Sequence, residues 1–481
     1  MDEMTPIYTA LKKYQAENGL RLHMPGHVGG SGISAPELQG LAGLDVTEVP
    51  GLDDLHMPRG VIAAAQEQMA RACGAAASLF LVNGATSGIH ALLMSGSQGE
   101  RIMIPRNAHR AFYGGLVLSG ARPVYLPCEL EPNLGIALAV MPAAVETALQ
   151  QHSEVGAVFV TSPSYYGTCA DIAGIAAAAQ RRGKDLLVDE AHGAHFPFHP
   201  SYPPSALQQG AAAAVCGLHK TWPVLTQAAC LHLGPGFSRR ARLRAAYDLL
   251  TTSSPSYPLL AGIDVARAYM QSAGGAGLER GLELAREYKP RLDGIAGLRC
   301  HGEELLHLPG VIALDPLKVL ISLPGLSLTG MQLAQLLREE YHIQVESAEP
   351  NLILAMFSLL HGREHWERFY LALEGIAQRY PGTGQAGPAV KPPPPGEYIL
   401  SPRQAFFAAK RQVSLAASRG KVAAELVAAY PPGIPCLWPG ERISPEIWDY
   451  LHYLQKNGIP IQGPACTDLE HITIIDEEAE G

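Results

Sequence analysis

Short apolar segments alternate with helix-like segments through the first half of this 481-residue chain. The helix-like segment at residues 171–183 ends in two arginines and a glycine, as many helices do. Strands that are apolar throughout and separated by helices indicate an α/β fold with a mainly parallel sheet, covered on both faces. Ligands bind such sheets where loops leave the carboxyl ends of the strands. The predicted strands are residues 78–82, 101–104, 123–126, 157–161, 185–188 and 213–216.

Two of these strand ends carry residues that suit an anion and a flat ring. After the first strand, the segment NGATSGIHALL places Thr86 and Ser87 at the start of a helix, where backbone N–H groups and hydroxyls can bind an anion. An ordinary helix cap is the alternative interpretation. After the second strand, His109 in RNAHRAFYGGL can stack on a planar ring, or it can be a capping or core histidine.

The segment DLLVDEAHGAH places Asp189 directly after an apolar strand, followed by Glu190, His192 and His195. A carboxylate at the end of a buried strand is costly unless it has a partner. An aspartate with two histidines could bind Zn²⁺ or Fe²⁺, but no further ligand follows. The competing interpretation is that Asp189 holds a proton on a heteroaromatic nitrogen.

Lys220 lies four residues after the last predicted strand, in the segment AAVCGLHKTW. A lysine beside a buried strand end is a candidate Schiff-base amine, because apolar surroundings favour its neutral, nucleophilic form. A lysine that extends into solvent is the alternative. One ligand, pyridoxal phosphate, explains all four features in this order: an anion-binding turn, a stacking histidine, a carboxylate and an amine.

Composition narrows the function further. The net charge is −9 and no run of Lys or Arg is present, so we expect no nucleic-acid partner. The eight cysteines are scattered without CxxC spacing, which argues against a zinc site and for a reducing cytoplasm. The N-terminal segment lacks the apolar core of a signal peptide, and no apolar stretch reaches the length of a membrane span. We therefore predict a cytoplasmic protein with no metal and no membrane partner.

A proline tract near residue 390 marks the clearest domain boundary, since polyproline continues neither a helix nor a central strand. We predict the following organisation: an N-terminal segment (1–40), a large cofactor-binding domain (41–260), a small α/β domain (261–382), a linker (383–396) and a C-terminal module (397–481).

Nine motifs in order along the chain resemble the Orn/Lys/Arg decarboxylase family of fold type I, aminotransferase-like pyridoxal-phosphate enzymes. The resemblance runs from about residue 20 into the C-terminal module, and the chain length is similar to that of the compact arginine/lysine decarboxylase-type members. The motifs are HMPGH (23–27), DVTEVPGLDDLH (45–56), NGATSGI (83–89), RNAHRA (106–111), SPSYYGT (162–168), DEAHGAH (189–195), HKT (219–221), LSPRQAFFA (400–408) and YPPGIP (430–435).

The resemblance implies a role for each candidate residue. Lys220 would form the Schiff base, Asp189 would pair with the pyridine N–H, and His109 would stack on the ring. His192 would lie near the cofactor, and the phosphate would be held by Ala85, Thr86, Ser87 and His219. It also implies a homodimer or higher oligomer, and a place in polyamine biosynthesis.

The resemblance implies decarboxylation of arginine or lysine first, and ornithine next, to the amine and CO₂. A cationic substrate needs a carboxylate partner. Candidates, each of which could instead cap a helix or pair with an arginine, are Asp45, Glu48, Asp53, Asp54, Glu346 and Glu349.

Two departures from the family pattern bear on cofactor affinity and substrate identity, and the same set of cofactor residues also serves other functions. Family members commonly have a small hydroxyl residue directly before HK, where this chain has Gly217 and Leu218, and Val28 replaces the usual lysine after HMPGH. Another fold type I enzyme, an aminotransferase or a carbon–sulfur lyase, is one alternative. A non-catalytic regulatory relative is the other.

Overall fold

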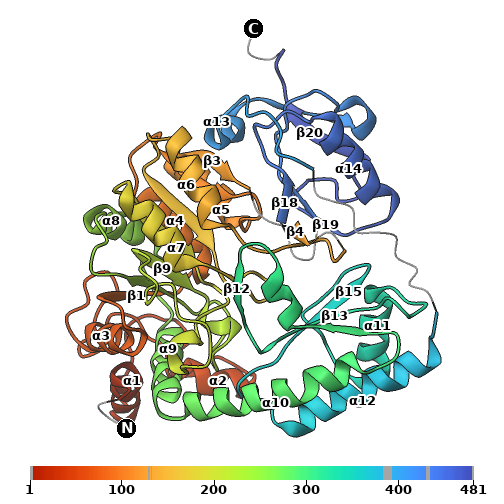
Figure 1. Ribbon diagram of the computed structural model, residues 1–481. Coiled ribbons are helices and arrows are strands. Elements are labelled where there is room, and N and C mark those ends of the chain that lie inside the picture. Colours follow the sequence, from red (N-terminus) through yellow and green to blue (C-terminus); the bar gives the residue numbers. More distant parts are fainter. Residues whose placement is uncertain (1–3, 128–129, 132, 383–392, 430–433, 479–481) are drawn as a thin grey trace. The chain divides into compact units, whose positions relative to one another are not determined.

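The computed structural model describes residues 4–127, 130–131, 133–382, 393–429 and 434–478 (Figure 1). The chain forms two units, each made of separate stretches of sequence. The first unit comprises residues 1–95 and 185–279, and the second comprises residues 96–184 and 280–481. The predicted linker at 383–396 and the motif YPPGIP lie largely outside the described residues.

The first unit contains one sheet and the helices that pack on it. Its strands are β1 (Ala77–Leu81), β8 (Asp185–Asp189), β9 (Ala213–Cys216) and β10 (Ala229–Leu233). Its α-helices are α1 (Pro6–Ala16), α2 (Pro36–Ala42), α3 (Val61–Cys73), α4 (Gly84–Met94), α8 (Arg240–Leu250) and α9 (Tyr257–Tyr269), and α10 (Gly275–Asp293) begins here. Short helical turns are η1 (Val28–Gly30), η2 (Phe196–Phe198), η3 (Leu218–Lys220) and η4 (Met270–Gly274).

The strands of the first unit lie in the order β1-β10-β9-β8. Strands β8 and β9 are parallel, whereas β10 runs antiparallel to both of its neighbours. Helix α4 packs closely on this sheet because residue 88 is glycine. A Cβ at Gly88 would lie 2.7 Å from Leu81 Cδ1 and 2.9 Å from Val215 Cγ1.

The second unit begins with three parallel strands in the order β6-β2-β3. Its strands are β2 (Arg101–Pro105), β3 (Arg122–Leu126) and β6 (Ala157–Thr161). The accompanying elements are α5 (Ala111–Ser119), α6 (Pro142–Gln151), α7 (Ile172–Arg181), β4 (Leu130–Glu131), β5 (Ile136–Ala137) and β7 (Thr168–Ala170).

A four-stranded antiparallel sheet follows in the same unit, in the order β11-β13-β15-β14. Its buried side chains pack with those of α10, α11 and α12 in one apolar core that contains Trp366 and Phe369. The elements of this part are β11 (Arg299–His301), η5 (Glu303–His307), β12 (Val311–Leu314), β13 (Lys318–Ser322), α11 (Gly330–Tyr341), β14 (Ser347–Ala348), β15 (Leu352–Met356) and α12 (Arg363–Arg379).

The C-terminal module has its own apolar core, built from α14 and the strands around it. Strand β16 pairs with β20, and β17 lies between β18 and β19. The elements are α13 (Pro402–Phe407), β16 (Lys410–Ser414), η6 (Leu415–Ala417), β17 (Val427–Ala429), β18 (Ile434–Leu437), α14 (Pro445–Lys456), β19 (Ile461–Gln462) and β20 (His471–Ile475).

The predicted mixed α/β fold is confirmed. All six predicted strands are present, with residues 157–161 and 213–216 matching β6 and β9 at both ends. The sequence did not predict the antiparallel strand β10, which inserts between β1 and β9.

Candidate active site

Four chain segments of the first unit meet at one edge of its sheet. Strand pairing aligns Asp189 with Val215, Cys216 with Cys230, and Ala229 with Leu81. The carboxyl ends of β1, β8 and β9 therefore lie beside the start of the antiparallel strand β10. This edge carries the turn before α4, the segment after Asp189, η3 and the loop that leads into β10.

Asp189 is the last residue of β8 and is only 3% exposed. Among the described residues, its carboxylate receives one hydrogen bond, from the Ala191 N–H to Oδ1 at 3.1 Å. Burial raises the pKa of this carboxyl, and the Lys220 charge and the Ala191 N–H partly oppose the rise. A buried carboxylate with so few partners is suited to accept a proton-bearing nitrogen.

Lys220 is the last residue of η3, and its Nζ lies 3.0 Å from His192 Nε2. Two hydrogen bonds join the residues on either side of η3 to the segment after β8. The Gly217 N–H donates to the Ala191 carbonyl at 3.2 Å, and the Trp222 indole donates to the Ala194 carbonyl at 3.0 Å. Lys220, His192 and Asp189 are thus held together by backbone contacts as well as by their side chains.

Gly217 is required by this close approach. A Cβ at this position would lie 2.9 Å from the Ala191 carbonyl oxygen, and 3.3 Å and 3.4 Å from Cδ and Cε of Lys220. Leu218 beside it is fully buried. The departure from the family pattern before HK therefore coincides with tight packing against Lys220.

The start of α4 offers backbone N–H groups to an anion. Its N-cap residue, Asn83, makes no side-chain cap hydrogen bond, so the first-turn N–H groups at Ala85 and Thr86 are not capped by it. The Ser87 hydroxyl donates to the Gly84 carbonyl at 2.8 Å. Ser87 would have to leave that carbonyl in order to donate to a phosphate.

The loop into β10 joins this turn to η3. Gln227 donates from its side chain to the Val82 carbonyl, at 2.5 Å, and the Ala228 carbonyl accepts from the backbone N–H and the Nδ1 of His219, at 3.2 and 2.9 Å. The Thr221 hydroxyl oxygen is buried and has no hydrogen-bond partner among the described residues. Thr221 directly follows Lys220 in the motif HKT and is not among the candidate residues predicted from the sequence.

These residues fit pyridoxal phosphate. The cofactor needs an amine, an anionic partner for its ring nitrogen and donors for its phosphate. Lys220, Asp189 and the uncapped start of α4 supply them at one edge of one sheet. The unpartnered Thr221 hydroxyl adds a further donor beside Lys220.

Glu190 and His195, which belong to the same motif as Asp189, contact residues other than Lys220 and His192. Glu190 is 4% exposed and accepts from the Ala206 N–H at 2.7 Å, while the Cys216 thiol lies 3.6 Å from its other oxygen. Burial raises the pKa of Glu190 to about 8. His195 is 1% exposed and packs against the rings of Phe196 and Tyr202.

The predicted acidic residues of the first unit have local partners. Asp53 oxygens accept backbone N–H groups from Asp54, Arg59, Gly60, Ile62 and Ala63 at 2.7–3.3 Å. Partial burial raises the pKa of Asp53, but these backbone donors outweigh it and the net shift is downward. The other three contact near neighbours: Asp45 lies 3.1 Å from His27 Nε2, Asp54 accepts from the His56 N–H, and Glu48 accepts from the Thr47 hydroxyl.

The two acidic candidates of the second unit contact consecutive tyrosines of SPSYYGT. Tyr165 donates to Glu346 at 3.0 Å, and Tyr166 donates to Glu349 at 2.7 Å. Burial raises the pKa of Glu349 to about 7. The sequence predicts both carboxylates as substrate candidates and contains the motif SPSYYGT, but it does not predict that the two are in contact.

His109 also belongs to the second unit, in the turn between β2 and α5. Its Nδ1 accepts the Ala111 N–H at 3.2 Å.

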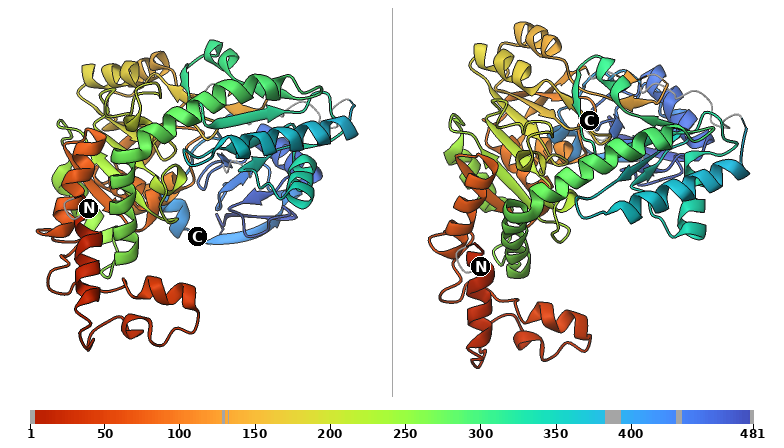
Figure 2. Two further views of the ribbon diagram at one scale, coloured as in Figure 1. Left: turned by 90° about the horizontal axis from the view of Figure 1, so that it is seen from below. Right: turned by 60° about the horizontal axis from the view of Figure 1, so that its bottom comes forward.

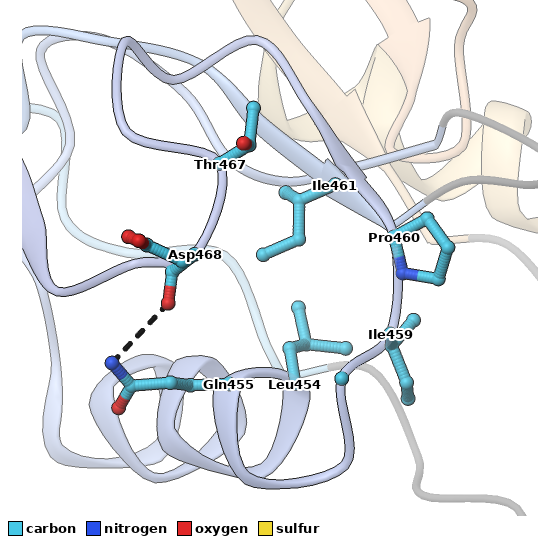
Figure 3. A pocket seen from close by; sticks show the side chains of 8 residues that line it. Leu454, Gln455, Ile459, Pro460, Ile461, Thr467 and Asp468 are labelled. Atoms are coloured by element: carbon cyan, nitrogen blue, oxygen red, sulfur yellow. Dashed lines mark hydrogen bonds between the residues drawn. The ribbon is translucent and has the colours of Figure 1, made fainter.

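A cavity of about 500 Å³ lies in the C-terminal module and contains none of the predicted site residues (Figure 3). Leu454 and Ile461 point into it, and Thr467 and Asp468 lie at its border. Within the described ranges, no group of three or more His, Cys, Asp or Glu is placed to bind a metal ion. In the described part of the chain, no helix is both long enough and apolar enough to cross a bilayer.

Two family profiles match the chain. Residues 5–365 match "Orn/Lys/Arg decarboxylase, major domain", and residues 393–461 match "Orn/Lys/Arg decarboxylase, C-terminal domain". The arginine decarboxylase of Bacillus subtilis is 36% identical over 483 residues, which cover 98% of each chain. The lysine decarboxylase LdcA of Pseudomonas aeruginosa is 26% identical, over 94% of this chain and 76% of that one.

Solved structures share the fold. The lysine decarboxylase LdcF of Francisella novicida superposes with a TM-score of 0.85 at 21% identity, over 99% of this chain and 82% of that one. A structure described as "SPT with PLP" gives a TM-score of 0.52 at 16% identity, over 66% and 76%.

The chain shares the fold of these lysine decarboxylase and pyridoxal-phosphate-bound structures, and Lys220 and Asp189 lie at one edge of its sheet. The chain belongs to the Orn/Lys/Arg decarboxylase family and is a pyridoxal-phosphate-dependent decarboxylase of basic amino acids.

Proposed function

We propose that this enzyme removes the α-carboxyl group of arginine as CO₂ and releases the corresponding amine, with lysine as the second candidate substrate and ornithine as the third. The preference for arginine rests on the relatives. A protein named arginine decarboxylase is 36% identical along nearly its whole length, whereas one named lysine decarboxylase is 26% identical and extends well beyond this chain.

One observation carries the assignment of the site. Lys220 Nζ lies 3.0 Å from His192 Nε2, at the sheet edge where the buried Asp189 ends β8. When bound, pyridoxal phosphate withdraws into its ring the electron pair left by the broken Cα–carboxylate bond. Lys220 Nζ would hold the cofactor at its aldehyde carbon.

The remaining residues act on protons and charge. Asp189 would keep the proton on the ring nitrogen, an electrostatic contribution that is present before the reaction begins. His192 Nε2 would exchange a proton with Lys220 Nζ, which would return a proton to the substrate α-carbon. Ala85, Thr86, Ser87 and His219 would contact the phosphate, and Thr221 would join them.

Our assignment of His109 as the ring-stacking residue rests on its motif. For the cationic end of the substrate, Asp45, Glu48, Asp54, Glu346 and Glu349 remain our candidates. Asp53 is the weakest of the six, because backbone N–H groups already occupy both of its oxygens.

We propose that the chain works as a homodimer or higher oligomer. The segment after α1 exposes apolar side chains that a partner copy would bury, with Leu20 at 84% and Leu22 at 87%. Figure 2 shows this segment, drawn in red, extending away from the sheet of its own unit in both views. We further propose that it is a cytoplasmic enzyme that supplies polyamine biosynthesis. The seven cysteines that are free thiols among the described residues agree with a reducing cytoplasm.

We also propose the domain boundaries given above, with the linker at 383–396. The gap between the two family matches, from residue 365 to residue 393, supports a boundary in this part of the chain.

A substrate panel tests the function. Purified protein with added pyridoxal phosphate is incubated with arginine, lysine, ornithine and an uncharged amino acid, and CO₂ and amine are measured. We expect arginine to give the highest kcat/KM, and K220A to lose both turnover and the visible absorbance of lysine-bound cofactor. Amino transfer to a keto acid without CO₂ would favour an aminotransferase, and no reaction with bound cofactor would favour a regulatory relative.

A further inference from the structure

A buried ion pair joins the C-terminal module to the main body of the second unit. The guanidinium of Arg106 contacts both carboxylate oxygens of Glu441, with Nη2 2.8 Å from Oε2, and the same Nη2 donates to the Cys436 carbonyl at 3.0 Å. The two side chains are 14% and 0% exposed. Glu441 Oε2 also accepts the Trp438 N–H at 3.0 Å.

Aromatic rings surround this pair. The Arg106 guanidinium lies 5.0 Å from the centre of the Tyr125 ring, and the Tyr125 hydroxyl is 2.7 Å from that of Tyr398. Trp438 packs edge-on against Tyr113. A two-point contact between charged groups in such dry surroundings fixes geometry more strongly than an exposed ion pair does.

Arg106 begins the turn that carries His109. It directly follows β2, and its N–H donates to the Leu126 carbonyl at 3.3 Å. Four residues (107–110) separate it from Ala111, the first residue of α5. The N-cap residue of α5, Arg110, makes no side-chain cap hydrogen bond. Arg106 anchors the start of this turn, because its guanidinium is held by the C-terminal module.

We propose that Arg106 and Glu441 are positioning residues that hold the His109 turn in the geometry needed to bind pyridoxal phosphate. The C-terminal module thereby contributes to cofactor affinity through one ion pair. This inference rests on the ring-stacking role proposed for His109.

The chain supplies a matched control. Arg403 of α13 also reaches from the C-terminal module to α5, and its Nη1 donates to the Val117 and Leu118 carbonyls at 3.3 and 3.0 Å. These carbonyls lie at the end of α5 that is remote from His109. R403A therefore removes a contact between the same two parts without touching the His109 turn.

The test is a double-mutant cycle on cofactor affinity. The full chain is stripped of cofactor and titrated with pyridoxal phosphate, and Kd is read from visible circular dichroism for wild type, E441Q, H109A, E441Q/H109A and R403A. We expect E441Q and H109A each to weaken binding about 10-fold, because small displacements of a positioned group have effects of this size or larger. The double variant should bind no more weakly than H109A alone.

R403A should bind the cofactor as wild type does. The proposal would be overturned if the losses of cofactor affinity in E441Q and H109A were additive in the double variant. An unchanged Kd in E441Q, or an equal loss of affinity in R403A, would also overturn it. If E441Q fails to fold, as judged by melting of the cofactor-free protein, R106K replaces it. The lysine ammonium keeps the charge but cannot make the two-point contact. R106K should therefore weaken cofactor binding when His109 is present, and should cause no further loss when it is combined with H109A.

The proposed function can fail separately. If wild type binds no pyridoxal phosphate, or K220A keeps the absorbance of lysine-bound cofactor, the site assignment is wrong. If both behave as expected while E441Q binds normally, only the positioning role is wrong.

Discussion

The Nζ atom of Lys220 and the Nε2 atom of His192 lie 3.0 Å apart at the edge of the first unit's sheet. This contact joins the amine proposed to hold the cofactor to an imidazole nitrogen, a group that can accept or donate a proton. It makes the role of His192 in proton exchange directly testable.

Replacing His192 by glutamine should lower kcat at least about 100-fold, the lower end of the usual contribution of a positioned acid–base group, with a smaller effect on KM. The pH profile of kcat should lose one of its limbs, because glutamine does not titrate. Steady-state kinetics across pH 6–9 measure both. H199Q is the control, because His199 belongs to the same stretch of chain but contacts Glu279 at 2.6 Å. Equal losses in the two variants would contradict a specific role for His192.

Replacing Asp189 by asparagine should reduce turnover at least about 100-fold, since the developing negative charge loses its preorganised partner. Asparagine keeps the shape and can still accept the Ala191 N–H. Cofactor should therefore remain bound but show a changed absorbance spectrum. Turnover within about twofold of wild type would remove Asp189 from the site.

Restoring the hydroxyl residue that family members have before HK should harm this particular chain. A serine at position 217 places its Cβ 2.9 Å from the Ala191 oxygen and against the Lys220 side chain. We expect G217S to cost about 1–3 kcal/mol of unfolding free energy and to lower kcat. The control is G236S, because no atom lies within 4 Å of a Cβ at Gly236. Tighter cofactor binding by G217S without loss of stability would contradict this expectation.

Glu190 should make stability fall as pH rises. Burial raises its pKa from 4.5 to about 8 in the folded chain, with a contribution from Asp189, whereas the unfolded chain keeps the ordinary value. Between these two values the folded state binds the proton and the unfolded state does not. The stabilisation is therefore complete below about pH 4.5 and is lost progressively up to about pH 8.

E190Q has no such proton, so its stability relative to wild type should increase with pH by at most about 1.4 kcal/mol per unit. Urea unfolding of the cofactor-free proteins at pH 5.5, 6.5 and 7.5 measures the difference. Taking the difference cancels the other titrating groups, such as His232, whose pKa burial lowers to about 4. A constant difference across this range would show that Glu190 is ionised throughout.

The strands and the chemistry at their ends were readable from the sequence. Apolar runs of four or five residues report burial on both faces, and the residues that follow them must lie at the sheet edge. These patterns alone predict that Asp189 and Lys220 lie at the sheet edge, and in the structure both do. The need for glycine at position 217 was not readable, because it depends on the Ala191 oxygen from another strand end.

By itself, the sequence determined the fold class, the family and the residues suited to the cofactor, because each depends on patterns within short segments. Tertiary structure decided which of them meet. The loop that leads into the antiparallel strand β10 links the start of α4 to His219. Backbone N–H groups occupy the carboxylate oxygens of Asp53, and Arg106 pairs with Glu441, which lies 335 residues away in the chain. Such contacts depend on the pairing of distant segments, and a segment's own pattern records only whether it is buried, not what buries it.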